Sequence, residues 1–229
     1  MRLVSTVGRL LTACGVAGAL VAGAAPGVTA SAHRPAAASG ADHAGHRSDG
    51  PREAADHPRK PADRARHQGA YARLHLVTAL SAERLATADL VAAAKYGTGA
   101  PIDDPARERQ VLDTVARLAR EAGGDPEATV RIFRDQIEAN KVVQRALHRA
   151  WDADPSSAPT ERPDLGKVRE VINRVNGDLV LAVAASAAER GAPYCPGLRA
   201  VTVVHVRHER ALDALHASAL GHAVRSVCD

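Results

Sequence analysis

Three aspartates mark the starts of helical segments, and they constrain the fold more than any other feature. Asp104 and Asp125 each precede a proline, and Asp164 precedes a leucine. An aspartate accepts hydrogen bonds from the free backbone N–H groups of a first helical turn, and proline fits there because it has no N–H to leave unpaired. Apolar residues then recur every three or four positions, which is the helical period. The sequence predicts an all-α, single-domain bundle of about five helices, at residues 71–95, 105–121, 126–152, 165–190 and 197–227.

Composition narrows the function as well as the fold. Aromatic residues make up 2% of the 229 residues, too few for a β-sandwich or for an RNA module that stacks bases on aromatic rings. The β-branched run from Val201 to Val204 has no second strand to pair with, so we interpret it as helix. Outside the first 32 residues the chain has 28 basic and 26 acidic residues. This excess is too small to indicate a nucleic-acid partner.

The first 32 residues have the pattern of a secretory leader. Arg2 and Arg9 precede an apolar run from Leu10 to Ala25, and Ala30-Ser31-Ala32 offers the small residues that signal peptidase needs for cleavage before His33. A membrane anchor is the first alternative, although the apolar run is shorter than the ~20 residues that a span requires. A lipoprotein is the second, because Cys14 follows Leu-Thr-Ala. We predict a cleaved leader at residues 1–32, a secreted or periplasmic location, and no membrane contact after cleavage.

Residues 33–69 mix Ala, Pro, Gly, Arg, Asp and His without apolar periodicity. Such a segment buries too little apolar surface to become ordered, so we predict a disordered linker before a helical domain at residues 70–229. Five of the eleven histidines lie in it, which raises metal capture as an alternative: His33, His43, His46, His57 and His67. Their irregular spacing favours a solvated linker.

Two cysteines, Cys195 and Cys228, remain once the leader with Cys14 is removed. An even number of cysteines in an exported chain favours pairing. A redox or metal thiol site is the alternative, but the sequence has no CxxC motif. We predict one disulfide.

Polar residues interrupt the apolar stripes of three predicted helices. Arg84 and Lys95 lie on the stripe of the first helix, Asn140 and Gln144 on that of the third, and Arg169 near the start of the fourth. An unpaired buried charge costs several kcal/mol, so each cation needs a partner or a solvated position. The three cations share one sign, however, and amides accompany them. This combination favours a pocket between helices for a small polyanion.

Motifs for other chemistry are missing from the sequence. It contains no GxSxG, P-loop, GxGxxG or HExxH motif. His205, His208 and His216 lack the carboxylate context of a metal site, so we predict no metal and no cofactor.

Several separated motifs resemble the all-helical AroQ class of chorismate mutases, in order and at matching spacing. They are Ala82-Glu83-Arg84-Leu85, the stretch from Asp89 to Lys95, Pro101-Ile102-Asp103-Asp104, Arg107-Glu108-Arg109, the stretch from Phe133 to Gln136, and the stretch from Asn140 to Gln144. The segment from Trp151 to Leu165 and the pair Cys195 and Cys228 resemble the secreted γ subclass. The resemblance spans residues 76–228. It implies an isomerase that converts chorismate to prephenate and often forms a homodimer.

The resemblance also implies roles for individual residues. Arg84, Arg107 and Arg169 would bind the substrate carboxylates, Arg169 coming from the same chain. Lys95 would contact a carboxylate and the ether oxygen, and Gln144 the ether oxygen. The catalytic set is thus Arg84, Lys95, Gln144 and Arg169, and Asp104, Arg107, Glu108 and Asn140 complete the substrate-binding set. Asn140 replaces the usual Ser or Thr near the ring carboxylate, and Val111 stands where some members have a polar residue.

A rival function is a secreted helical binding protein that kept the fold without catalysis. The complete set of cations argues against it, because a buried cation without an anion destabilises the fold.

Overall fold

Helices account for all the regular secondary structure in the part of the chain that the structure describes. The computed structural model describes residues 61–228, so the predicted leader, residues 33–60 of the predicted linker and the last residue lie outside it. The helices are α1 (Pro61–Lys95), α2 (Pro105–Glu121), α3 (Pro126–Ala153), α4 (Leu165–Ala185), α5 (Ala187–Arg190), α6 (Cys195–Glu209) and α7 (Ala214–Ala223), with short 3-10 helices η1 (Pro155–Ser157) and η2 (Arg225–Cys228). The all-α prediction is confirmed.

The three predicted helix starts are confirmed at the level of hydrogen bonds. Asp104 Oδ1 accepts from the backbone N–H of Arg107 at 3.0 Å. Asp125 caps α3 by accepting from the N–H of Glu127 at 2.8 Å, and Asp164 caps α4 by accepting from the N–H of Gly166 at 2.7 Å. Each carboxylate satisfies N–H groups that have no partner within the helix, which fixes where α2, α3 and α4 begin.

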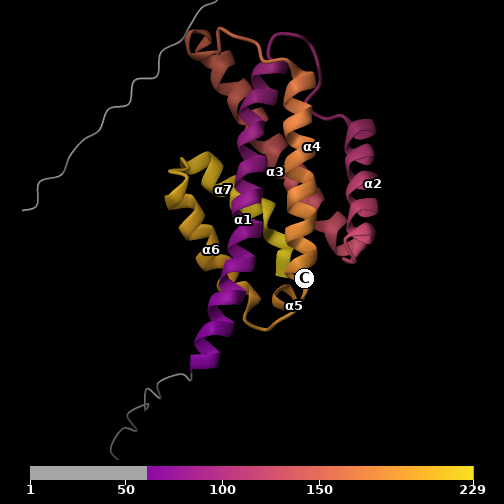
Figure 1. Cartoon of the computed structure of the whole chain (residues 1–229). Coiled ribbons are helices and arrows are strands. Elements are labelled where there is room, and N and C mark those ends of the chain that lie inside the picture. The colour runs from indigo at the N-terminus through magenta and orange to yellow at the C-terminus, as the bar shows by residue number, and fades with distance from the viewer. Residues whose placement is uncertain (1–60, 229) are drawn as a thin grey trace, which may run out of the picture. The chain divides into compact units, whose positions relative to one another are not determined.

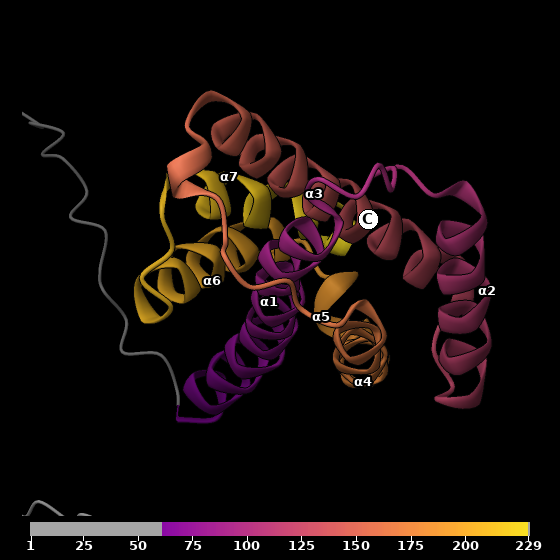
Figure 2. The ribbon, with the colours of Figure 1, turned by 90° about the horizontal axis from the view of Figure 1, so that it is seen from above.

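Helix α1 runs through the middle of the bundle. Figure 1 shows α4 beside it, with α2 on one side of this pair and α6 and α7 on the other. Seen from above in Figure 2, α3 passes across the bundle from α7 to α2, and it packs against α1, α2 and α7. The core between these helices consists of fully buried aliphatic side chains and one aromatic ring, among them Leu74, Leu85, Ile132, Phe133, Leu179 and Leu220. The four helices α1 to α4 thereby surround a common space.

Helix α1 begins ten residues earlier than predicted. Residues 61–69, which we assigned to a disordered linker, are helical and form its first turns, which differs from that prediction. Pro61 fits a first helical position, and lengthening a helix needs no new nucleus. The ring of His67 also lies edge-on to that of Tyr194, with 6.3 Å between centroids. This contact holds the extension against the start of α6.

The last two predicted helices are each broken. The segment predicted at 165–190 is interrupted at Ser186, whose hydroxyl donates to the carbonyl of Val183 at 3.1 Å and so competes with the helical pattern. The segment predicted at 197–227 divides into α6 and α7. Ala211 between them has a φ of 48°, a left-handed conformation that ends a helix, and Asp213 caps α7 by accepting from the N–H of His216. Val201 to Val204 are helical, as predicted.

The predicted disulfide between Cys195 and Cys228 is confirmed. It joins the first residue of α6 to the last residue of η2, and Cys195 is completely buried. The disulfide therefore links the two ends of the segment that contains α6, α7 and η2.

None of the helices at residues 61–228 has a stretch long and apolar enough to cross a bilayer.

Candidate active site

All eight predicted site residues line one cavity between α1, α2, α3 and α4. The cavity has a volume of about 690 Å³, open space at its mouth included. Its polar lining consists of Arg84, Lys95, Asp104, Arg107, Glu108, Asn140, Lys141, Gln144 and Arg169, and its apolar lining of Val91, Ile102, Val111, Ile137, Leu165 and Ile172. The sequence pattern therefore identified residues on four helices that lie together in the structure.

Arg84 lies at the base of the cavity with its charge uncompensated by a carboxylate. It is 5% exposed, and its guanidinium lies over the ring of Phe133 at 5.8 Å from the centroid. Nε donates to Oδ1 of Asn176 at 2.9 Å, and Nη1 donates to the carbonyl of Gln136 at 3.0 Å. Burial lowers the pKa of Arg84 to about 10. Neutral acceptors thus orient this cation, and Nη2 has no hydrogen-bond partner among the described residues.

Lys95 and Arg169 bring two further positive charges to the same cavity. Nζ of Lys95 donates to the carbonyls of Pro101 and Ile102, at 2.9 and 3.4 Å. Burial lowers the pKa of Lys95, and Arg169 adds to this effect, against the opposing influence of Asp104. Two neighbouring positive charges favour the binding of an anion between them.

Asp104 and Arg107 occupy the first turn of α2, at the side of the cavity. The cap formed by Asp104 holds this turn in place. Arg107 donates to Oε1 of Gln110 at 2.6 Å and to Oδ1 of Asn173 on α4 at 3.2 Å. Both acceptors are neutral amides, so the positive charge of Arg107 stays available to a ligand.

Asn140 and Gln144 are buried on α3 and form one hydrogen-bonded pair. Nε2 of Gln144 donates to Oδ1 of Asn140 at 2.6 Å, and the buried Oε1 of Gln144 has no partner in the described residues. This bond uses one of the two N–H groups of Gln144 Nε2, so the other N–H of Gln144 and the NH2 group of Asn140 are left for a ligand.

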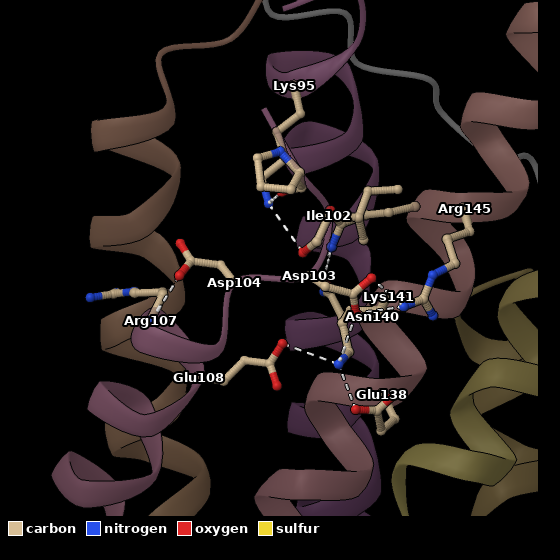
Figure 3. A network of polar contacts seen from close by, with 12 residues as sticks. Lys95, Ile102, Asp103, Asp104, Arg107, Glu108, Glu138, Asn140, Lys141 and Arg145 are labelled. Carbon is tan, nitrogen blue, oxygen red and sulfur yellow. Dashed lines mark hydrogen bonds and ion pairs between the residues drawn. The ribbon is translucent and has the colours of Figure 1, made fainter. Parts of the chain in front are cut away.

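Lys141 is a cavity residue that the sequence analysis missed. Its side chain is 10% exposed, and Nζ contacts Glu108 at 3.1 Å, Asp103 at 3.3 Å and Glu138 at 2.6 Å. Figure 3 shows this cluster, with Lys141 between the acids and Arg145 on the far side of Asp103. Lys141 lies at the edge of the apolar stripe, and a lysine at such a position is usually solvated. The sequence signal that could have indicated its burial was the presence of Glu108 on α2 and Asp103 in the preceding loop.

The interpretations of the inward polar residues as core salt bridges or solvated groups fail for Arg84, which is buried without an acid partner. Lys95 is half-buried and Arg169 is exposed; both line the cavity, and neither forms a salt bridge in the described part of the chain.

Within residues 61–228, no three His, Cys, Asp or Glu side chains gather as a metal site would require. His205 instead contacts the hydroxyl of Tyr71, and His216 contacts Asp89 and Asp213.

Known proteins resemble the chain over this same domain. Residues 75–145 match the family described as chorismate mutase type II. The secreted chorismate mutase of Mycolicibacterium smegmatis is 37% identical over 150 residues, which are 65% of this chain and 82% of that protein. The secreted chorismate mutase of Mycobacterium tuberculosis is 34% identical over 164 residues, 72% of this chain and 82% of that one. The crystal structure of chorismate mutase from Burkholderia phymatum is 36% identical with a TM-score of 0.66, and the match covers 70% of this chain and 99% of that one.

The secreted relatives confirm the predicted location outside the cytoplasm. The extent of these matches over a shared helical domain also confirms the resemblance that the sequence motifs carried. The chain belongs to the type II chorismate mutase family.

Proposed function

We propose that the cavity binds chorismate and that the chain catalyses its rearrangement to prephenate. The observation that carries this proposal is the convergence of Arg84, Lys95, Arg107 and Arg169 on one cavity in which no carboxylate pairs with them in a salt bridge. Chorismate carries two carboxylates, so it supplies the negative charge that this arrangement lacks.

The positions of the cations suggest how the substrate would be held. Arg84 at the base and Arg107 and Arg169 at the sides offer guanidinium groups to the two carboxylates, which arginine can grip with two parallel bonds. Lys95 and Gln144 would donate to the ether oxygen, where negative charge develops as the C–O bond lengthens. Asp104 and Glu108 would accept from the ring hydroxyl, and Asn140 would donate to the ring carboxylate.

This reaction requires no covalent bond between the substrate and the protein. The substrate rearranges within itself, so the site needs to hold a compact conformation and to stabilise charge on one oxygen. A millionfold acceleration corresponds to about 8 kcal/mol, which a few preorganised donors supply. The apolar walls formed by Val91, Val111 and Ile137 would exclude water and strengthen those interactions.

The test is to incubate the purified chain with chorismate and to follow the loss of chorismate and the appearance of prephenate. We expect turnover without an added metal or cofactor. Binding of chorismate without turnover, by a protein shown to be helical and disulfide-bonded, would instead support the rival function, a binding protein that kept the fold.

A further inference from the structure

The ammonium group of Lys141 is the centre of an acidic cluster on the wall of the cavity. Three carboxylates from three elements contact it: Glu108 from α2, Glu138 from α3 and Asp103 from the segment between α1 and α2. Arg145 Nη2 holds Asp103 from the other side, at 2.6 and 2.8 Å from its two oxygens. Figure 3 shows that these groups point toward one another.

The geometry leaves Lys141 no donor for a substrate. A lysine ammonium has three N–H groups, and three carboxylates lie at 2.6 to 3.3 Å from it. Burial lowers the pKa of Lys141, but the hydrogen bonds to Glu138, Glu108 and Asp103 outweigh this effect and raise it above its usual value. Lys141 therefore remains a cation that is fully occupied by acids.

Glu108 is the member of the cluster that faces the cavity. It accepts from Lys141 through Oε1, and no other described residue bonds to Oε2. Without a cation between them, the three carboxylates would repel one another and would also repel an anionic ligand. The exposed Glu138 and Asp103 could turn into solvent, but so could Glu108, and the cavity would then lose one of its two carboxylate acceptors, the other being Asp104.

We propose that Lys141 is a positioning residue, which holds the Glu108 carboxylate in the cavity wall with one oxygen directed to a hydroxyl group of the ligand. Asp103 and Glu138 occupy the other two donors and fix the ammonium in place. This inference rests on the proposed function, because it assigns Glu108 as the acceptor for the substrate hydroxyl.

A double-mutant cycle on Lys141 and Glu108 tests the inference. Lys141→Met lowers kcat/KM for chorismate about tenfold or more, because a hydrogen-bonded charged acceptor loses its position. In a Glu108→Gln background the same substitution lowers kcat/KM less than about threefold, because the group it positions is already gone. An equal loss in both backgrounds would mean that Lys141 acts directly on the substrate, and would overturn the inference.

Two further variants separate positioning from folding and from total charge. Lys141→Arg retains more activity than Lys141→Met, because arginine can still bind Glu108; equal losses would contradict a positioning role. Lys167→Met removes a cation from an exposed position of α4 outside the cavity and leaves kcat/KM unchanged. Circular dichroism and thermal unfolding of each variant show that the bundle is intact. A wild-type chain that fails to turn over chorismate would refute the proposed function itself, whereas an active wild type with an equally active Lys141→Met variant refutes only this inference.

Discussion

Gln144 donates a hydrogen bond of 2.6 Å from Nε2 to Oδ1 of Asn140, one turn earlier on α3. This bond turns the buried Oε1 of Gln144 away from any partner in the described residues. If both amides rotate by half a turn, Asn140 becomes the donor, Oε1 of Gln144 is satisfied, and Nε2 of Gln144 is free to donate to a ligand. Each arrangement leaves Gln144 an N–H for the ether oxygen and Asn140 an N–H for a carboxylate, and the second arrangement also satisfies Oε1 of Gln144.

Replacing Gln144 by Glu makes catalysis dependent on acid pH. A carboxylate cannot donate to the ether oxygen and repels a dianion, so kcat at neutral pH falls about 100-fold, as for loss of a donor to developing charge. Activity of Gln144→Glu rises as the pH falls and the side chain is protonated, whereas the wild type stays flat. The pH–rate profiles of both proteins check this, with the exposed Gln68→Glu as the control. A wild type that also needs acid would contradict the proposed role.

Removing Arg169 abolishes turnover and leaves the fold intact. Arg169 is exposed at the side of the cavity, so its loss opens no core cavity. We expect a fall in kcat/KM of about 100-fold or more, because a charged contact to the dianion is lost. Arg174→Ala is the matched control, since Arg174 lies on the same helix with only a 3.5 Å contact to Glu83. Equal activity of the two variants would exclude Arg169 from the site.

Activity falls in alkali below the ordinary pKa of a lysine. Burial lowers the pKa of Lys95 from 10.5, and that of Arg84 is about 10. Both residues must be protonated to bind an anion, so kcat/KM decreases as the pH rises toward the lowered pKa of each residue. A bound dianion stabilises the protonated forms, so the decrease in kcat lies at higher pH. Profiles that are flat up to pH 10.5, with the fold intact, would show that neither cation matters.

Reducing the disulfide destabilises the domain. Cys195 and Cys228 are 33 residues apart, and closing a loop of this length is worth about 3–4 kcal/mol through the entropy of the unfolded chain. Urea unfolding with and without a reductant measures the difference. The same midpoint in both conditions would show that the packing of α6 and α7 holds without the bond.

His216 makes stability depend on pH in the opposite sense to a carboxylate. It bridges Asp89 on α1 and Asp213 at the start of α7, at 3.1 and 2.9 Å. Burial lowers the pKa of His216, but its bonds to the two aspartates outweigh this and raise it above 6.5. Its contribution to stability is therefore complete below pH 6.5 and disappears as the pH rises through the higher value in the folded state.

The measurement is the free energy of unfolding of the wild type and of His216→Gln on both sides of this window. The difference between the two proteins should be larger on the acid side. His208→Gln, which removes an exposed histidine, should change stability equally at both pH values. A constant difference for His216→Gln would show that the histidine is not charged in the fold.

Local chemistry made part of this structure predictable. The capping aspartates and the 3–4 stripes determine α2, α3 and the start of α4, and the stripes placed Arg84, Asn140 and Gln144 inside. The break at Ala211, which has a left-handed φ of 48°, was not predictable in this way, because alanine favours helix.

Lys141 escaped prediction for a similar reason. Glu138 lies three residues away on the same helix, but the other two acids lie 33 and 38 positions away, and only the fold brings them to Lys141. A pattern within one helix contains no information about those two contacts.

The lining of the cavity comes from a single polypeptide, since α1, α2, α3, α4 and the segment between α1 and α2 of one chain supply it. An exported protein is diluted as soon as it leaves the cell, and assemblies that share a site between subunits lose it when they dissociate. Here the residues that line the cavity come from one folded molecule at any concentration. We therefore expect turnover per molecule to be independent of protein concentration.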